Sequence, residues 1–241
     1  MFLNMNQKTM RLFLCLCGIL SLLTACQPAV QGESLPSSGI SQGISEETFQ
    51  PAPSRLPSPT GEETTPELFL ASRTEEELLL FVDAAWAAVG GPGMERSFAS
   101  PADISSEGLL SFFFRITDEQ AFYREETEAG KVSQRYYCIP LEAVTSQLDR
   151  YFDEYTFCLE DTNWAEEYDR DKQQFISRSF IGWGDSVVWK IDTVRGEEKN
   201  IFIAANQLDP TDPEKLLATG TLQLFFNNQE IRFLSFHYQP C

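Results

Sequence analysis

The spacing of apolar residues changes once along this chain, from a helical period to a strand period. Between residues 78 and 89 apolar side chains recur every three or four positions, which places them on one face of an α-helix. From residue 187 the pattern alternates, with Val187, Trp189 and Ile191 on one side of a strand. A chain that forms helices first and strands afterwards is expected to adopt an α+β fold, with N-terminal helices packed on a C-terminal antiparallel meander sheet.

Three helices are expected before that sheet. The first begins at Thr74-Glu75-Glu76-Glu77, a capping box in which Thr74 and Glu77 each accept a hydrogen bond from the other's backbone N–H, and it ends at Gly90-Gly91-Pro92. The second is expected from residue 103 or 105 to about residue 116. The third has Pro140 in its first turn and an apolar face between residues 141 and 152.

The remaining elements are expected to be strands. Residues 121–137 indicate a hairpin with a break at residues 128–130. The meander continues through residues 201–206, 219–226 and 230–238. Asn227-Asn228 separates the last two strands, and because Asn tolerates positive φ, the pair predicts a tight turn there.

The order of helices, hairpin, helix and meander over residues 70–239 resembles that of the cone-shaped NTF2-like domains, with the chain closing on Arg232-Phe233-Leu234-Ser235-Phe236. The resemblance is one of element order, without a diagnostic motif. It implies one domain with helices on a curved sheet. That fold hosts both enzymes and binding modules, so it implies no particular activity.

The N-terminus has the layout of an export signal. Residues 1–11 contain Lys8 and Arg11 and no acid, and an apolar run follows at residues 12–23. That run is shorter than the roughly 20 residues of a membrane-spanning helix, so removal is favoured over retention as an anchor. Directly after it stands Leu23-Thr24-Ala25-Cys26, which resembles the lipobox of bacterial lipoproteins.

The resemblance implies that residues 1–25 are a signal peptide and that the Cys26 thiol carries a diacylglyceryl group. Cleavage then makes Cys26 the new N-terminus. Two acyl chains hold a protein on a membrane durably, because each buried methylene contributes about 0.8 kcal/mol. The expected location is the extracytoplasmic face of a cell membrane.

Between the lipid and the folded part, residues 26–65 are expected to be a tether. After Cys26 this segment is rich in Ser, Pro, Gly, Glu and Thr, with only scattered apolar residues. Such a composition buries too little apolar surface to fold and is typical of a disordered, partly extended linker. Residues 66–241 are then expected to form a single α+β domain.

Charge excludes one class of partner. The chain has 36 Asp and Glu against 18 Lys and Arg, for a formal net charge of −18, and loss of Lys8 and Arg11 makes the mature form more negative. Nucleic-acid binding requires clustered Lys and Arg that neutralise phosphates. We therefore expect no nucleic-acid partner, and a membrane contact made through the lipid on Cys26.

Histidine chemistry would have to use His237, the only histidine in the chain. On a regular strand Ser235 and His237 lie on the same face as Phe233, in apolar surroundings. That setting favours a structural histidine over a catalytic one.

The cysteines and acids give no metal motif. Outside the signal segment no CxxC spacing exists, and residues 153–171 lack the glycine and final acid of a calcium-binding EF-hand loop. Cys138 and Cys158 flank the helix at residues 141–152, and their spacing is consistent either with a disulfide in an oxidising compartment or with free thiols. Cys241 is then left unpaired.

Cofactor motifs are equally missing from the sequence. Gly182-Trp183-Gly184 lacks the third glycine of a dinucleotide loop, and no phosphate-binding Gly-Lys-Ser or Gly-Lys-Thr occurs. Trp164, Trp183 and Trp189 either line a ligand groove or pack in the core. No cofactor is expected.

These observations favour a non-catalytic lipoprotein domain that binds a small ligand or an envelope protein. A carboxylate-dependent cell-envelope hydrolase and a structural or transporter-associated subunit are the alternatives. A cleft that joins two acids, one of them with a raised pKa, would favour the hydrolase, whereas an apolar patch or a closed cone mouth would favour binding.

Overall fold

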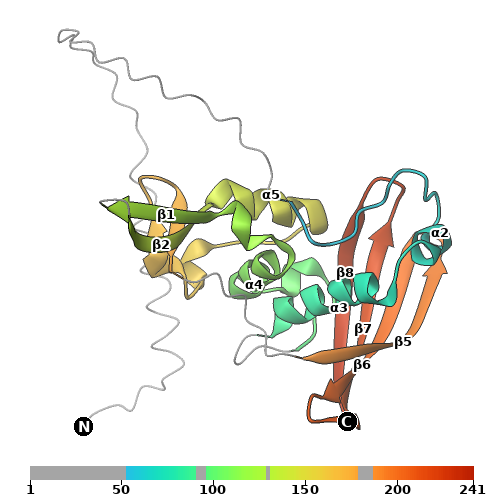
Figure 1. Ribbon diagram of the computed structural model, residues 1–241. Helices are drawn as coiled ribbons and strands as arrows, with labels where there is room; N and C mark the ends of the chain where they lie inside the picture. The colour runs from blue at the N-terminus through green and yellow to red at the C-terminus, as the bar shows by residue number, and fades with distance from the viewer. Residues whose placement is uncertain (1–52, 91–95, 129–130, 179–186) are drawn as a thin grey trace, which may run out of the picture. The chain divides into compact units, whose positions relative to one another are not determined.

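The computed structural model describes residues 53–90, 96–128, 131–178 and 187–241, which all belong to one unit, Phe49–Cys241. These residues form α-helices and two antiparallel sheets (Figure 1), which confirms the α+β class. The signal segment, Cys26 and tether residues 27–52 lie outside the described residues, so what the sequence predicts for them stays a prediction.

Three helices lie where the apolar periodicity places them: α3 (Glu75–Val89), α4 (Ser106–Ile116) and α5 (Leu141–Tyr151). A short helix that the sequence did not predict, α2 (Pro66–Ala71), precedes them. The capping box of α3 is confirmed, because the Glu77 N–H donates to Thr74 Oγ1 over 3.2 Å and the Thr74 N–H donates to Glu77 Oε2 over 2.8 Å. Pro140 differs from its expected place: it is the N-cap of α5 rather than its first helical residue, because strand β2 continues up to it.

The larger sheet is the predicted meander. Strands β5 (Val188–Glu197), β6 (Asn200–Asp209), β7 (Asp212–Phe226) and β8 (Ile231–Pro240) lie in the order β5-β6-β7-β8, each antiparallel to the next. Alternate side chains of β6, including Ile201, Ile203 and Ala205, are buried. Helix α3 packs against all four strands along one face (Figure 1).

The smaller sheet contains the predicted hairpin, made of β1 (Tyr123–Glu128) and β2 (Lys131–Pro140). Two short strands that the sequence did not predict, β3 (Tyr168–Asp169) and β4 (Gln174–Ser177), extend it in the order β1-β2-β4-β3. Strand β4 pairs with β2 only over residues 137–140. Most of the hairpin is therefore a two-stranded ribbon with exposed side chains.

Phenylalanine rings join the helices to the larger sheet. The Phe112 ring on α4 lies 4.6 Å from Phe152, which directly follows α5, and 5.0 Å from Phe233 on β8. All three side chains are buried. This cluster holds α4 and α5 against β8 and so determines where the end of β8 lies relative to the start of α4.

The turn between β7 and β8 forms at Asn227, but by another mechanism than predicted. Asn227 Oδ1 accepts hydrogen bonds from the Gln229 and Glu230 N–H groups over 2.8 and 2.9 Å. Neither Asn227 nor Asn228 has positive φ. The prediction of a tight positive-φ pair was therefore wrong: the Asn227 side chain holds a longer turn by bonding to the backbone.

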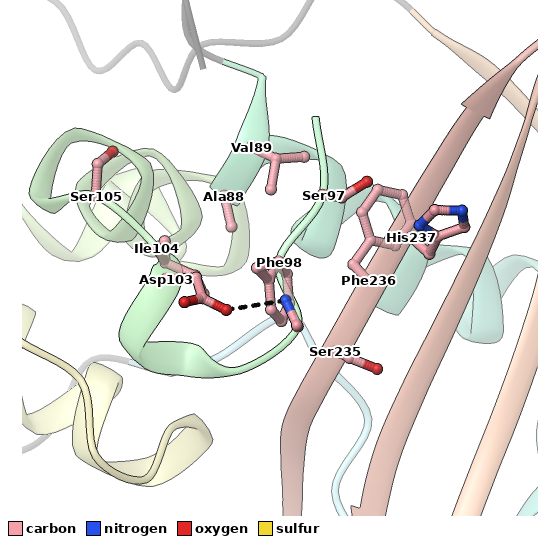
Figure 2. Close-up of a pocket in the computed structure, with 11 residues that line it drawn as sticks. Ala88, Val89, Ser97, Phe98, Asp103, Ile104, Ser105, Ser235, Phe236 and His237 are labelled. Atoms are coloured by element: carbon pink, nitrogen blue, oxygen red, sulfur yellow. Dashed lines mark hydrogen bonds between the residues drawn. The ribbon is translucent and has the colours of Figure 1, made fainter. Parts of the chain in front are cut away.

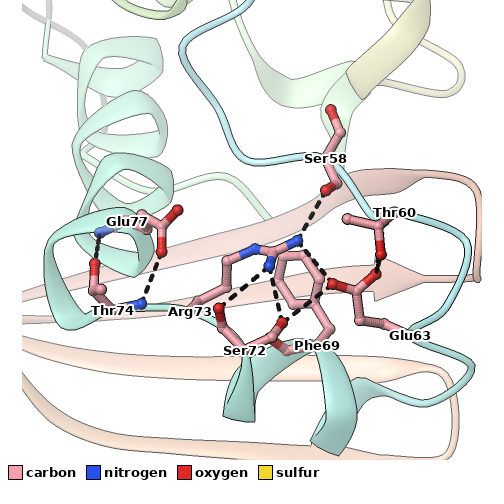
Figure 3. Close-up of polar contacts among 8 residues, drawn as sticks. All are labelled: Ser58, Thr60, Glu63, Phe69, Ser72, Arg73, Thr74 and Glu77. Atoms are coloured by element: carbon pink, nitrogen blue, oxygen red, sulfur yellow. Dashed lines mark hydrogen bonds and ion pairs between the residues drawn. The ribbon is translucent and has the colours of Figure 1, made fainter.

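Residues 53–65, here called the strap, contact the folded unit although the sequence assigns them to the tether. The Arg55 N–H donates to the Ile116 carbonyl over 2.6 Å, and Leu56 is 4% exposed. Farther along, Glu63 Oε1 lies 3.2 Å from Arg73 Nη2 (Figure 3). Ordered contacts thus reach at least to Pro53 rather than starting at Pro66, because the strap bonds to Ile116 at the end of α4, to Arg73 after α2 and to side chains of α5.

Candidate functional site

A cavity of about 840 Å³ lies at the place where α3 ends, α4 begins and β8 runs past them (Figure 2). Apolar side chains form much of its wall, including Val89, Phe98, Ile104 and Phe236. The polar residues among those that line it are Ser97, Asp103, Ser105, Ser235 and His237. An apolar wall with a few polar groups is the usual composition of a small-molecule site.

Segment 97–99 closes one side of the cavity by adding to the edge of β8. Phe98 and Phe236 exchange backbone hydrogen bonds of 2.8 and 2.9 Å. One step away, the Tyr238 N–H donates to Ser97 Oγ over 2.9 Å. The backbone of this segment is therefore fixed by β8, more than 130 residues later in the chain.

Asp103 is held in the wall by its own loop. Its Oδ2 atom accepts from the Ala99 N–H over 3.1 Å, the dashed line in Figure 2, and from the Ser100 N–H over 2.8 Å. Both bonds use Oδ2, so Oδ1 remains as an acceptor on the same carboxylate. The side chain is exposed and lines the cavity.

His237 reaches the cavity because β8 contains a bulge. Ser235 pairs with Gln223 and Phe233 pairs with Leu224, so Leu234 is an extra residue in the ladder. A bulge moves the residues beyond it to the opposite face. The prediction that Ser235 and His237 share a face with Phe233 was therefore wrong: Phe233 is buried, whereas His237 is exposed.

The polar groups of the cavity do not form a nucleophile–base pair. Ser235 Oγ lies 3.5 Å from Gln223 Oε1, and Ser97 Oγ accepts a hydrogen bond from the Tyr238 N–H. Among the described residues His237 has no hydrogen bond to a serine or a carboxylate. The arrangement offers a charged acceptor, hydroxyls and an imidazole around an apolar space, which is chemistry suited to binding.

A second cavity, of about 530 Å³, lies beside Arg232 and contains three acids, Asp149, Asp153 and Glu154. Two of them are already used: Asp153 Oδ1 lies 2.7 Å from Arg232 Nη1, and the Tyr155 hydroxyl donates to Asp149 Oδ1 over 2.7 Å. Burial, and next the bond to Asp149, raise the pKa of Tyr155. These contacts tie α5 and the loop after it to β8, which is a structural role.

The other acids between residues 153 and 171 are spread over short helices and β3. They lie on Leu159–Asp161, on Ala165–Glu167, at Asp169 and, in the turn after β3, at Asp171. Within the part of the chain that the structure describes, no three metal-ligating side chains cluster.

Cys138, Cys158 and Cys241, the cysteines among the described residues, are free thiols. Burial raises the pKa of Cys138, and a hydrogen bond to Glu160 raises the pKa of Cys158, so both are less nucleophilic than an ordinary thiol. Cys138 lies on β2 and Cys158 on the loop after α5, and the disulfide that their spacing allows is not formed here.

Two of the tryptophans pack in the core, and neither lines a cavity. Trp189 is 7% exposed and its ring lies 5.8 Å from that of Trp86. Trp164 packs at 4.7 Å on Phe114. Trp183 lies outside the described residues.

Comparison with protein-family models, curated proteins and solved structures finds no match to this chain. No helix among the described residues is both long and apolar enough to cross a membrane. Sequence reasoning singled out Ser235 and His237 but missed Ser97, Phe98 and Asp103. Nothing local marks Ser97 and Phe98, because they reach the site through pairing with a distant strand. Asp103 is placed by bonds to its own loop, which alone do not indicate a cavity.

Proposed function

We propose that this chain is a lipid-anchored extracytoplasmic lipoprotein whose folded domain binds a small ligand in the cavity between α3 and β8. The observation that carries the binding role is the cavity itself. Its volume of about 840 Å³ lies within the range of roughly 300–1,000 Å³ for small-molecule sites. Its apolar wall, single carboxylate and ring of hydroxyls supply affinity and orientation together.

The anchoring role is supported by Leu23-Thr24-Ala25-Cys26 behind an acid-free, apolar N-terminus. A thiol is nucleophilic enough to take a lipid through a thioether, which explains why this position requires cysteine. The strongly negative net charge of the chain repels anionic headgroups, so the lipid rather than the domain surface makes the membrane contact.

The geometry favours binding over the hydrolase alternative. Glycoside cleavage uses two carboxyl groups roughly 5 to 9.5 Å apart across the substrate, and among the described residues Asp103 is the only Asp or Glu that lines the larger cavity. Burial raises the pKa of Asp83, yet that residue pairs with Arg115 over 3.2 Å and lines neither cavity.

The anchor is tested by the variant Cys26→Ala in the native host. We expect this protein to appear in the medium instead of the membrane fraction, because the acceptor of the lipid is gone. Mass spectrometry of the wild-type protein is expected to show a lipid-modified N-terminal Cys26. Retention of Cys26→Ala in the membrane, or an unmodified cysteine in the wild type, would rule out the anchor.

The binding role is tested by obstructing the cavity. Ala99 is exposed and lines the cavity, whereas Ala102 is exposed nearby and does not line it. The probes are three indoles of similar shape: tryptamine, tryptophol and indole-3-propanoate. Because the chain has one histidine, the Hε1 resonance of His237 reports binding as a single NMR signal.

We expect at least one probe to shift this signal saturably, Ala99→Phe to weaken that response about tenfold or more, and Ala102→Phe to leave it unchanged. A steric block of the wall removes the space that an indole needs. The binding role is refuted if no probe shifts His237, or if the two variants behave alike.

A further inference from the structure

The cavity has one charged residue in its described lining. Arg96, next to the lining residue Ser97, holds its guanidinium over the Trp86 and Tyr238 rings, 5.4 and 5.6 Å from their centroids. Asp103 is the only Asp, Glu, Lys or Arg among the described residues that line the cavity. Its Oδ2 atom is occupied by two backbone N–H groups, and its Oδ1 atom keeps acceptor capacity toward a ligand. A lone carboxylate beside an apolar wall attracts a cation and repels an anion.

The end of helix α3 adds to this negative potential. Ala88 and Val89, which line the cavity, are in the last turn of this 15-residue helix. That turn contains no basic residue. The final carbonyl groups of a helix carry the negative end of its dipole, and a cation near them is stabilised by about 0.3–1 kcal/mol.

The start of helix α4 carries the positive end of that helix dipole, which disfavours a cation, but its effect is partly offset. Ser105, which also lines the cavity, accepts from the Gly108 N–H over 3.1 Å and so occupies one of the free donors of the first turn. Glu107 places a carboxylate in the same turn. The N-terminal end of α4 therefore supplies less positive potential than an uncapped helix would.

The apolar wall determines the rest of the ligand. Phe98 and Phe236, whose ring centroids lie 6.4 Å apart, stand beside Ile104 and Val89. These side chains are at most 5% exposed, so they form a closely packed apolar surface against which a compact hydrophobic body would pack. Together, the apolar wall and the carboxylate fit a molecule that has an apolar body and a positive charge.

We infer that the cavity selects an amphipathic organic cation, a compact apolar or aromatic body bearing an ammonium group that pairs with Asp103. This inference rests on the proposed binding function and specifies its ligand class.

The same three indoles test the charge preference, because tryptamine is cationic, tryptophol neutral and indole-3-propanoate anionic at neutral pH. In titrations followed by the His237 resonance, we expect tryptamine to bind between about two- and fivefold more tightly than tryptophol, the range of an exposed ion pair. Indole-3-propanoate is expected to bind more weakly than either. Raising NaCl to 0.5 M should reduce both the tryptamine advantage and the indole-3-propanoate disadvantage and leave tryptophol unchanged, through screening.

The variant Asp103→Asn removes the charge but keeps an oxygen that can accept from the Ala99 and Ser100 N–H groups. We expect it to bring tryptamine and tryptophol within about 1.5-fold of each other. The matched control is Glu76→Gln, which removes one charge from an exposed position in the first turn of α3, at the other end of that helix. We expect Glu76→Gln to keep the preference for tryptamine over tryptophol.

The outcomes separate the two proposals. If the indoles bind equally well and Ala99→Phe blocks them, the binding function holds and the cation preference is wrong. A preference that survives Asp103→Asn also refutes the role of that carboxylate. If Asp103→Asn does not fold, the salt titration of the wild-type protein decides, since a tryptamine advantage that does not respond to salt contradicts an ion pair.

Discussion

Gly108 determines how closely α3 and α4 approach each other. A Cβ atom at this position would lie 2.1 Å from the Ala88 carbonyl oxygen and 3.1 Å from Ile104 Cγ2. Both neighbours are buried, and both residues line the larger cavity. The absence of a side chain at one residue therefore sets the distance between two walls of the proposed site.

Substitution Gly108→Ala is expected to destabilise the domain by at least about 2 kcal/mol, because backbone atoms must move apart to admit the methyl group. In an open helix the same change would stabilise by up to about 1 kcal/mol, so the sign of the effect is informative. Urea denaturation followed by circular dichroism measures it. A stability equal to or above that of the wild type would show that the helices are not in close contact.

The strap is the element whose stability depends most on polar contacts. Glu63 accepts from the Thr60 hydroxyl and from the Thr60 N–H, and its other oxygen contacts Ser72 and Arg73 (Figure 3). Arg73 also donates to the Ser58 carbonyl over 2.9 Å and covers the Phe69 ring at 4.4 Å. The carboxylate and the guanidinium are each about 9% exposed. One ion pair thus ties the strap to the end of α2.

The Glu63 contacts make the strap sensitive to acid. The hydrogen bonds from the Thr60 side chain, followed by that from its backbone, lower the pKa of Glu63 from 4.5 to about 2. A carboxyl whose pKa is lower in the folded state stabilises that state above the unfolded pKa. The contribution is complete above about pH 4.5 and is lost as the pH falls toward 2.

We therefore expect Glu63→Gln to be less stable than the wild type at pH 7 and the difference to shrink progressively below pH 4.5. Glu62→Gln, at an exposed neighbouring position, is the matched control and should follow the wild type at both ends of the range. Thermal unfolding at pH 7, 4 and 2.5 measures the three proteins. A stability difference between Glu63→Gln and the wild type that does not change with pH would contradict an ionised Glu63 in the strap.

For the whole molecule, the strap moves the boundary between tether and domain toward the N-terminus. Ser54 accepts from the Tyr151 hydroxyl over 2.8 Å and Ser58 from Arg150 over 2.6 Å, so α5 holds the strap as well. The tether that the sequence predicts after Cys26 is therefore shortened to residues before Pro53. The proposed membrane anchor therefore connects to a segment that is bonded to three helices.

A glutamate-specific protease distinguishes the two boundaries. Glu33, Glu46 and Glu47 precede the strap, whereas Glu62 and Glu63 lie within it. Mild digestion of the protein is expected to leave a stable fragment that begins at Glu47 or Thr48, because the strap backbone is held. N-terminal sequencing reads the result. A first stable fragment that begins at Glu63 or Thr64 would return the boundary to Pro66.

Local pattern predicted most of the elements. The capping box of α3, the limits of α4, the hairpin and the four-stranded meander follow from spacing and turn chemistry that neighbouring residues carry. Strands β3 and β4 were missed because they are short and lie among acids without alternation. The bulge at Leu234 was missed because pairing with β7, not the sequence of β8, places the extra residue.

The sequence by itself determined the α+β class, the helices, the meander and the proposed export and lipid signal, because each depends on residues close together in the chain. Only the tertiary structure decided the attachment of the strap, the face on which His237 lies and the existence of the cavity. These depend on partners far apart in sequence, such as Phe98 with Phe236, whose pairing becomes favourable only when the core brings them together.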